Sequence, residues 1–170
     1  DTPLQIDTSD TVAMEKALRL YNGKAMINSV NGKEESMNSV FPLCKKYGGV
    51  VVCLTLDENG IPEDVSGRIK IAEKIIKRAA EYGISKKDLV FDPLCMTVST
   101  NSQNAVITLQ SVKRLRRELG VNTVLGVSNV SFGLPARENL NSAFFTLALE
   151  NGLSAGIINP KSEMMMNSYY

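Results

Sequence analysis

Short apolar runs alternate with longer amphipathic segments along the whole chain. The clearest run covers residues 50–56, and its continuous hydrophobicity predicts a strand buried on both faces, as strands of parallel sheets are. The clearest amphipathic segment covers residues 64–82, where Val65, Ile69 and Ala72 begin a helical spacing with Lys and Glu between them. The chain is therefore predicted to repeat a strand followed by a helix.

The same unit recurs from end to end. Strands are predicted at residues 3–7, 24–30, 50–56, 89–95, 123–127 and 155–160. Helices are predicted at residues 10–20, 35–47, 64–82, 105–119 and 138–150, although Pro42 leaves the first part of the second helix unsettled. The helix at 138–150 is expected to place Leu140, Ala143, Phe144, Leu147 and Ala148 on one side. Glycines at positions 23, 48, 83, 120 and 152 are predicted to end the helices.

Strict alternation of strands and helices predicts an α/β fold with a parallel sheet, either a (β/α) barrel or a doubly wound sheet. The barrel is favoured, because no glycine-rich phosphate loop follows the first strand and polar residues end several strands. A complete TIM (β/α)8 barrel has eight strands in about 250 residues. We therefore expect residues 1–170 to form one partial barrel domain that lacks about two amino-terminal βα units. The Met and Tyr residues at 164–170 are expected to begin a final helix and to face the core.

Composition narrows the chemistry. The chain has 170 residues, 44% of them hydrophobic, and a formal net charge of +1, which gives no electrostatic reason to expect a nucleic-acid or membrane partner. No run is long enough to span a bilayer and none resembles a signal peptide. The three cysteines do not form a disulfide framework, so a cytoplasmic location is expected. Histidine is absent, which removes the usual zinc sites and Ser-His or Cys-His pairs. No metal is expected, and any chemistry relies on carboxylates, amides, hydroxyls or a cofactor.

Polar residues stand where the predicted strands end. In parallel α/β proteins, ligands bind at the carboxyl ends of strands, so these residues are candidates for one site. Each also has a purely structural interpretation: Asp7 as a helix N-cap, Asp92 as a turn former before Pro93, and Asn129 as a turn cap. The candidates are Asp7, Asn28, Asp92, Ser128, Asn129 and Asn159.

Four motifs together resemble those of a known family. They are Ile-Asp-Thr-Ser at 6–9, Ile-Asn-Ser at 27–29, Phe-Asp-Pro-Leu at 91–94, and Leu-Gly-Val-Ser-Asn-Val-Ser-Phe-Gly-Leu-Pro at 125–135, with Arg137 after it. Their order and spacing resemble the pterin-binding barrels of the methyltetrahydrofolate methyltransferases, a family that includes the folate-binding module of cobalamin-dependent methionine synthase. The resemblance covers essentially the whole chain, and it implies barrel strands three to eight.

The resemblance also implies roles for the candidates. Asp92 matches the carboxylate that accepts a ring N–H and the exocyclic amine of a pterin, an arrangement suited to a charge-assisted bidentate pair. Asp7 and Asn28 match positions that bind the remaining ring edge, and Ser128 and Asn159 are assigned to the same pterin site. Asn129 matches the catalytic residue that reaches the methyl-bearing nitrogen. The implied activity is a methyltransferase that passes the N5 methyl of 5-methyltetrahydrofolate to a cobalt(I) corrinoid, such as cobalamin, carried by another domain or protein.

Two other functions stay open. One is a dihydropteroate synthase-like pterin enzyme, although that family holds a phosphate at its last strand with a basic, histidine-containing motif, and here the strand ends in Asn159, Pro160 and Lys161. The other is a non-catalytic folate-binding module of a larger assembly. The final methyl acceptor, homocysteine or a protein of the acetyl-CoA pathway, is left open, and so is a homodimer. Cys44 and Cys53 are expected to be small buried residues, and Cys95 is expected to line the pocket rather than to act as a nucleophile or a zinc ligand.

Overall fold

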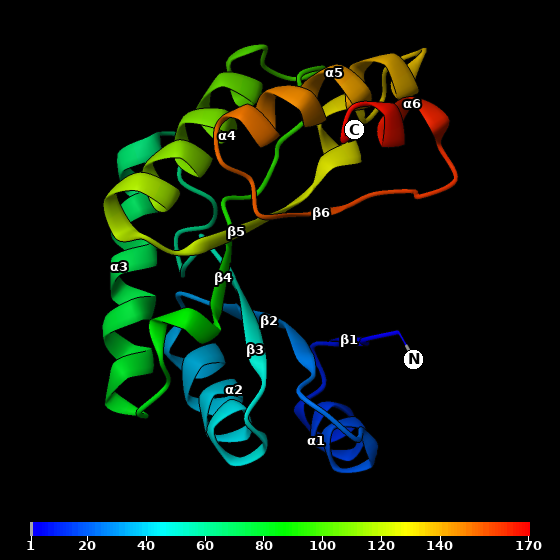
Figure 1. The fold of residues 1–170 in the computed structure, drawn as a ribbon. Coiled ribbons are helices and arrows are strands. Elements are labelled where there is room, and N and C mark those ends of the chain that lie inside the picture. Colours follow the sequence, from blue (N-terminus) through cyan, green and yellow to red (C-terminus); the bar gives the residue numbers. More distant parts are fainter. Residues whose placement is uncertain (1) are drawn as a thin grey trace.

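The computed structural model describes residues 2–170, which form a curved sheet of six parallel strands with helices on its outer side (Figure 1). The strands lie in sequence order, so each pairs only with its neighbours in the chain. They are β1 (Gln5–Asp7), β2 (Met26–Asn31), β3 (Val50–Leu54), β4 (Leu89–Asp92), β5 (Asn122–Gly126) and β6 (Ala155–Ile157). This confirms the prediction of a partial barrel, because consecutive parallel pairing with helical crossovers curls the sheet into a half-barrel.

Each strand is followed by a helix, and after the first five strands this helix returns the chain to the start of the next strand. The helices are α1 (Thr11–Leu20), α2 (Glu34–Tyr47), α3 (Val65–Glu81), α4 (Gln103–Arg114), α5 (Arg137–Glu150) and α6 (Glu163–Asn167). Shorter turns are η1 (Lys86–Asp88), the π-helical η2 (Leu115–Leu119) that continues α4, and the 3₁₀ turn η3 (Val127–Ser131) after β5. No helix in residues 2–170 is long and apolar enough to cross a membrane.

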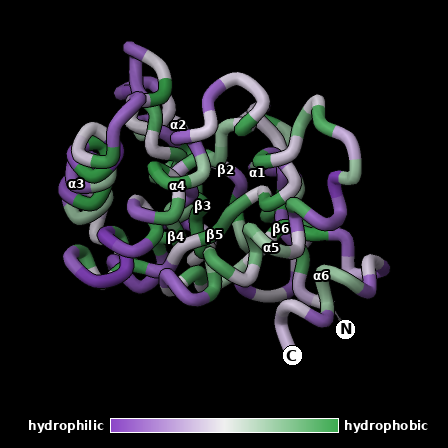
Figure 2. The backbone as a smooth tube through the Cα atoms, turned by 90° about the horizontal axis from the view of Figure 1, so that it is seen from above, coloured by the Kyte–Doolittle hydropathy of each residue, from purple (hydrophilic) through white to green (hydrophobic). Residues whose placement is uncertain are grey.

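Two hydrophobic clusters join the convex side of the sheet to the helices. The larger one centres on residues such as Ile27, Phe41 and Phe91, which are fully buried between the first four strands and helices α1 to α3. The smaller one packs Leu125 against Phe144 and Phe145 of α5. Hydrophobic residues accordingly colour the central strands, whereas α3 alternates between hydrophobic and hydrophilic turns (Figure 2).

The predicted elements are confirmed, with local differences. Pro42 does not interrupt α2, which runs unbroken from Glu34 and ends at Gly48 in the left-handed conformation. The prediction for α5 was partly wrong: Phe144, Phe145 and Ala148 are buried, whereas Leu140 and Leu147 are exposed. This helix carries apolar residues on several sides, so spacing alone could not select the buried face.

The prediction that the tail faces the core was also only partly correct. Met165 is buried in α6, but Met164 is exposed. Tyr169 and Tyr170 lie beyond the end of the helix, exposed, and pack edge to face against each other with ring centroids 5.3 Å apart. The tyrosines face solvent because the helix that would turn them inward ends at Asn167.

Candidate functional site

The concave face of the half-barrel has an apolar floor with polar groups beside it. Val52, Val90 and Val124 form this floor, and alternation along each strand directs them away from the helix-covered side. The same alternation puts Asp7, Asn28 and Asp92 on the concave face, because their strand neighbours Ile6, Ile27 and Phe91 pack on the convex side. An apolar floor beside a few polar groups is typical of a small-molecule binding site.

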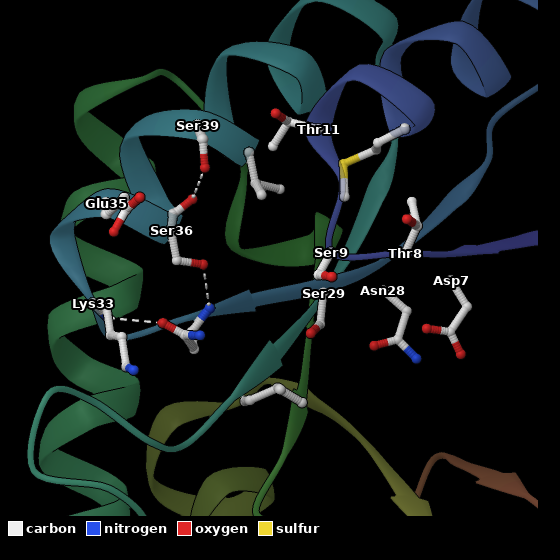
Figure 3. Close-up of a pocket in the computed structure, with 14 residues that line it drawn as sticks. Asp7, Thr8, Ser9, Thr11, Asn28, Ser29, Lys33, Glu35, Ser36 and Ser39 are labelled. Carbon is white, nitrogen blue, oxygen red and sulfur yellow. Dashed lines mark hydrogen bonds between the residues drawn. The ribbon is translucent and has the colours of Figure 1, made fainter.

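Asp7, at the end of β1, and Asn28 lie side by side (Figure 3). Asn28 lies within β2, just before the register shift between Asn28 and Val30, and not at the end of the strand as predicted. Asp7 and Asn28 are register partners, and the backbone N–H of Thr8 donates to the Asn28 carbonyl at 3.1 Å. Both line a cavity of about 560 Å³ that extends past Ser29 toward Lys33. The interpretation of Asp7 as an N-cap was wrong, because Asp10 caps α1 by accepting from the backbone of the first turn.

Asp92 ends β4 with little contact to solvent. Its side chain accepts a hydrogen bond from the backbone N–H of Leu94 at 2.7 Å through Oδ1, whereas Oδ2 has no partner in residues 2–170. Burial raises the pKa of this carboxyl to about 6, against the lowering effects of the Leu94 N–H and the Arg68 charge. The interpretation of Asp92 as a turn former is therefore correct for Oδ1, whereas Oδ2 remains available for a ligand.

Asn129 lies in the η3 turn just past the end of β5, and it is exposed. Its side-chain amide makes no hydrogen bond to any residue from 2 to 170, so it does not cap the turn. The amide nitrogen lies close over Gly126, where a Cβ would be 3.1 Å from Nδ2. Glycine at this position thus gives the Asn129 amide the space it occupies.

Backbone and side-chain bonds tie the loop that follows Asp92 to the loop that carries Asn129. Thr97 and Ser99 donate through their hydroxyls to the carbonyl of Phe132, at 2.7 and 3.0 Å. The N–H of Val98 donates to the carbonyl of Val130 at 2.9 Å. The two loops are therefore connected at the carboxyl ends of β4 and β5. We call this pair of loops, residues 93–99 and 127–132, the rim.

Ser128 and Asn159 meet at a second cavity, of about 390 Å³, between the β5 and β6 ends. Arg137 anchors this region by donating to the Ser128 carbonyl at 2.9 Å and to the Ser131 hydroxyl at 3.0 Å. The Asn159 side-chain oxygen accepts from the N–H of Lys161 at 3.1 Å, so it is engaged in its own turn. The structure thus groups Asp7 with Asn28 and Ser128 with Asn159, while Asp92 and Asn129 line neither of these two cavities.

The cysteines are buried and unpaired, as expected for Cys44 and Cys53. Cys95 does not line either cavity but belongs to the core beneath α5. Burial raises the pKa of its thiol to about 12, which keeps it protonated and argues against a nucleophilic role. Within the described residues, no group of three metal-binding side chains is close enough to hold an ion.

Sequence reasoning missed Arg68, which is buried beside Asp92. Its guanidinium donates to the carbonyls of Pro93 and Leu94, directly after that carboxylate. In the sequence Arg68 stands among the Lys and Glu residues of an amphipathic helix, which favoured an exposed position. The one signal for burial was its position next to Ile69, on the apolar side of that helix.

Comparisons with known proteins agree with this geometry. The family described as pterin binding enzyme matches residues 1–159. The chain is 31% identical to a methionine synthase of Mycobacterium tuberculosis, over 97% of this chain and 15% of that protein. It is 27% identical to the methylcorrinoid:tetrahydrofolate methyltransferase of Eubacterium limosum, over 100% of this chain and 64% of that protein. The chain thus spans less than two thirds of either relative.

A solved structure shows the same fold. The 7,8-dihydropteroate synthase from Vibrio fischeri superposes with a TM-score of 0.76 at 21% identity, over 99% of this chain and 66% of that one. This likeness supports the barrel architecture and says nothing about the reaction.

Proposed function

This chain belongs to the pterin binding enzyme family, and from that premise we propose that it binds 5-methyltetrahydrofolate on its concave face and transfers the N5 methyl group to a cobalt(I) corrinoid carried by another domain or protein. The observation that carries the proposal is Asp92, a buried carboxylate with a free oxygen on the same concave face as Asp7 and Asn28. The two similar methyltransferases, which cover the chain almost completely, support the choice of reaction.

The polar groups suit the edge of a pterin ring. Asp92 accepts the ring N–H and the exocyclic amine, because each carboxylate oxygen has two lone pairs and only one is taken by Leu94. Asp7 accepts from the remaining edge, and the Asn28 amide both donates and accepts. The flat ring then lies against the valine floor, which excludes water from these hydrogen bonds.

Asn129 suits the transfer step. The methyl group leaves a tertiary amine, which is a poor leaving group unless its nitrogen gains a hydrogen bond or proton as the bond breaks. When bound, a corrinoid would supply the cobalt(I) electron pair that forms the new bond to the methyl carbon, and N5 would keep the electron pair of the broken bond and take up one proton from solvent. Asn129 is exposed on the rim with a free amide, so it can donate to N5 while the acceptor approaches from outside the half-barrel.

Two other functions have less support. A dihydropteroate synthase shares the fold, but the last strand here leads to Asn159, whose oxygen is engaged by Lys161. Arg137, which lines the same cavity, is already bonded to the Ser128 carbonyl and the Ser131 hydroxyl. A non-catalytic folate-binding module would need Asp92 but not a free Asn129 amide. A reducing, cytoplasmic compartment remains our proposal for the location, consistent with three unpaired cysteines.

Calorimetric titration of 5-methyltetrahydrofolate into the full-length protein tests the proposal. We expect saturable binding, and we expect Asn28→Ala to weaken it about tenfold by removing hydrogen bonds at one ring edge. Asn38→Ala is the matched control, because this exposed amide on α2 contacts Arg78 and Tyr82 instead. A folded wild-type protein that binds no folate would refute the proposed function.

Gly126→Ala is expected to slow methyl transfer about tenfold with little change in folate affinity. The reason is that a small displacement of the Asn129 amide from its productive position lowers the reaction rate. The new methyl group would lie 3.1 Å from the Asn129 amide nitrogen and push it from its position. Gly126 has ordinary negative φ, so alanine is tolerated by the backbone. Measuring tetrahydrofolate formation and calorimetric affinity side by side checks this; an equal loss in both would contradict it.

A further inference from the structure

Arg68 is a charged side chain in the interior of the protein. It stands in the first turn of α3 and is 1% exposed. All its hydrogen bonds to the described residues go to backbone carbonyls: Nε donates to Pro62 at 3.1 Å, and Nη1 donates to Pro93 at 2.8 Å and to Leu94 at 3.0 Å. A buried guanidinium without a bonded carboxylate is unfavourable, and burial lowers its pKa. Such a residue needs an explanation beyond packing.

The carbonyls that Arg68 holds belong to the turn that shapes Asp92. Leu94 has a φ of 67°, a left-handed conformation that leucine rarely adopts. In this conformation the Leu94 N–H points back to Asp92 Oδ1 at 2.7 Å, while its carbonyl faces Arg68. The guanidinium of Arg68 therefore holds the carbonyls of the Pro93–Leu94 segment, while the N–H of Leu94 in the same segment holds the Asp92 carboxylate.

We propose that Arg68 is a positioning residue for pterin binding, which holds the Asp92 carboxylate in the orientation and charge state that the pterin edge requires. This inference rests on the proposed function, since it assigns Asp92 to the ligand. Arg68 does not touch the pterin: it acts through the Pro93–Leu94 carbonyls and through its charge.

The charge state follows from the groups around Asp92. Burial favours the neutral acid, and Arg68 from α3 is the cation that opposes it. Cys95, in the loop after β4, is a neutral thiol, and Asp64, the N-cap of α3, interacts with Arg68. Without Arg68, the Asp92 pKa is expected to rise from its value of about 6, so the carboxyl group is protonated over more of the neutral range.

The pH dependence of folate binding separates this role from a general effect on folding. Titrations of 5-methyltetrahydrofolate into the full-length protein should show binding that is lost as the pH falls through the Asp92 pKa. For Arg68→Met, we expect an affinity about tenfold or more lower at neutral pH and a midpoint shifted upward by about one unit. For Arg68→Lys, which keeps the charge but not the forked hydrogen bonds, the midpoint should stay near that of the wild type while affinity recovers only in part.

The control is Arg78→Met, at the other end of α3, where the arginine contacts Glu81 and Asn38 on the surface. It should leave both affinity and midpoint unchanged. An Arg68→Met protein with wild-type affinity and midpoint overturns the inference, and so does weaker binding at an unshifted midpoint that lysine does not rescue. If Arg68→Met does not fold, the lysine variant decides: reduced affinity at the wild-type midpoint supports the role, and wild-type affinity overturns it. Absence of binding by the wild type refutes the proposed function instead.

Discussion

Asp92→Asn is expected to reduce folate affinity at neutral pH at least about 100-fold while making the fold more stable. The substitution keeps the size of the side chain and an oxygen that can accept from Leu94. It removes the negative charge and places an NH₂ group where the pterin presents donors, so two charge-assisted hydrogen bonds are lost and donors face each other. Calorimetric titration of 5-methyltetrahydrofolate measures the first effect.

The gain in stability follows from the raised pKa. The folded-state pKa of Asp92 is about 6 and the ordinary value is 3.8, so the folded protein binds this proton more tightly than the unfolded chain does. Between these two values, wild-type stability is lost as pH rises, by about 3 kcal/mol in total at 1.36 kcal/mol per unit. Asparagine does not ionise, so the variant should exceed the wild type by up to about this amount at neutral pH, and the difference should vanish below about pH 4.

Asp57→Asn is the matched control, because Asp57 also accepts a hydrogen bond from the N–H two residues ahead, at 2.9 Å, but is only half-buried. It should leave folate affinity and unfolding free energy near their wild-type values. Denaturant unfolding across the acidic and neutral range provides the comparison. Folate binding retained by Asp92→Asn would remove Asp92 from the site, whatever its effect on stability.

The fold was predictable because the central strands β3 and β4 are buried on both faces and a helix such as α3 has one clear apolar face. The run at 50–56 could only be a covered strand, and the spacing at 64–82 could only be an amphipathic helix. Where a helix lacks one clear apolar face, the prediction of its buried residues failed. Helix α5 has apolar residues around its circumference, and Leu140 and Leu147 proved exposed. Tyr169 and Tyr170 were misplaced because α6 ends at Asn167, where the Ser168 hydroxyl donates to the carbonyl of Ser142 in α5, a contact that spacing within the tail cannot show.

The site was predictable where it follows from strand pairing alone. Asp7 and Asn28 are paired residues of adjacent parallel strands, so their proximity is a consequence of the register. The state of each side chain was not predictable, because it depends on local turns: Asn159 bonds to Lys161, whereas Asn129 stays free. Arg68 could not be identified, since its partners are carbonyls that only the tertiary fold brings to α3.

Asn129→Ala is expected to lower the rate of methyl transfer by about 100- to 1,000-fold while folate affinity changes less than about threefold. The distinction arises because N5 is a tertiary amine in the ground state and accepts little from the amide. As the methyl group departs, the nitrogen gains electron density and the hydrogen bond strengthens, so the interaction is made mainly in the transition state. Single-turnover formation of tetrahydrofolate in the full-length protein with a reduced corrinoid measures the rate, and calorimetry measures the affinity.

Asn129→Asp sharpens the test, because a carboxylate fits the same space but cannot donate in its ionised form. It should be as slow as the alanine variant if donation is what matters, and it should recover activity if Asn129 only fills space on the rim. Asn122→Ala serves as the control at the opposite end of β5, where the amide accepts from Arg116, and should transfer methyl at the wild-type rate. A loss of folate affinity that matches the loss of rate in Asn129→Ala would place Asn129 in ground-state binding. Because Asn129 is free of internal partners on an exposed turn, its amide can follow the nitrogen as charge develops, a freedom that the engaged Asn159 lacks.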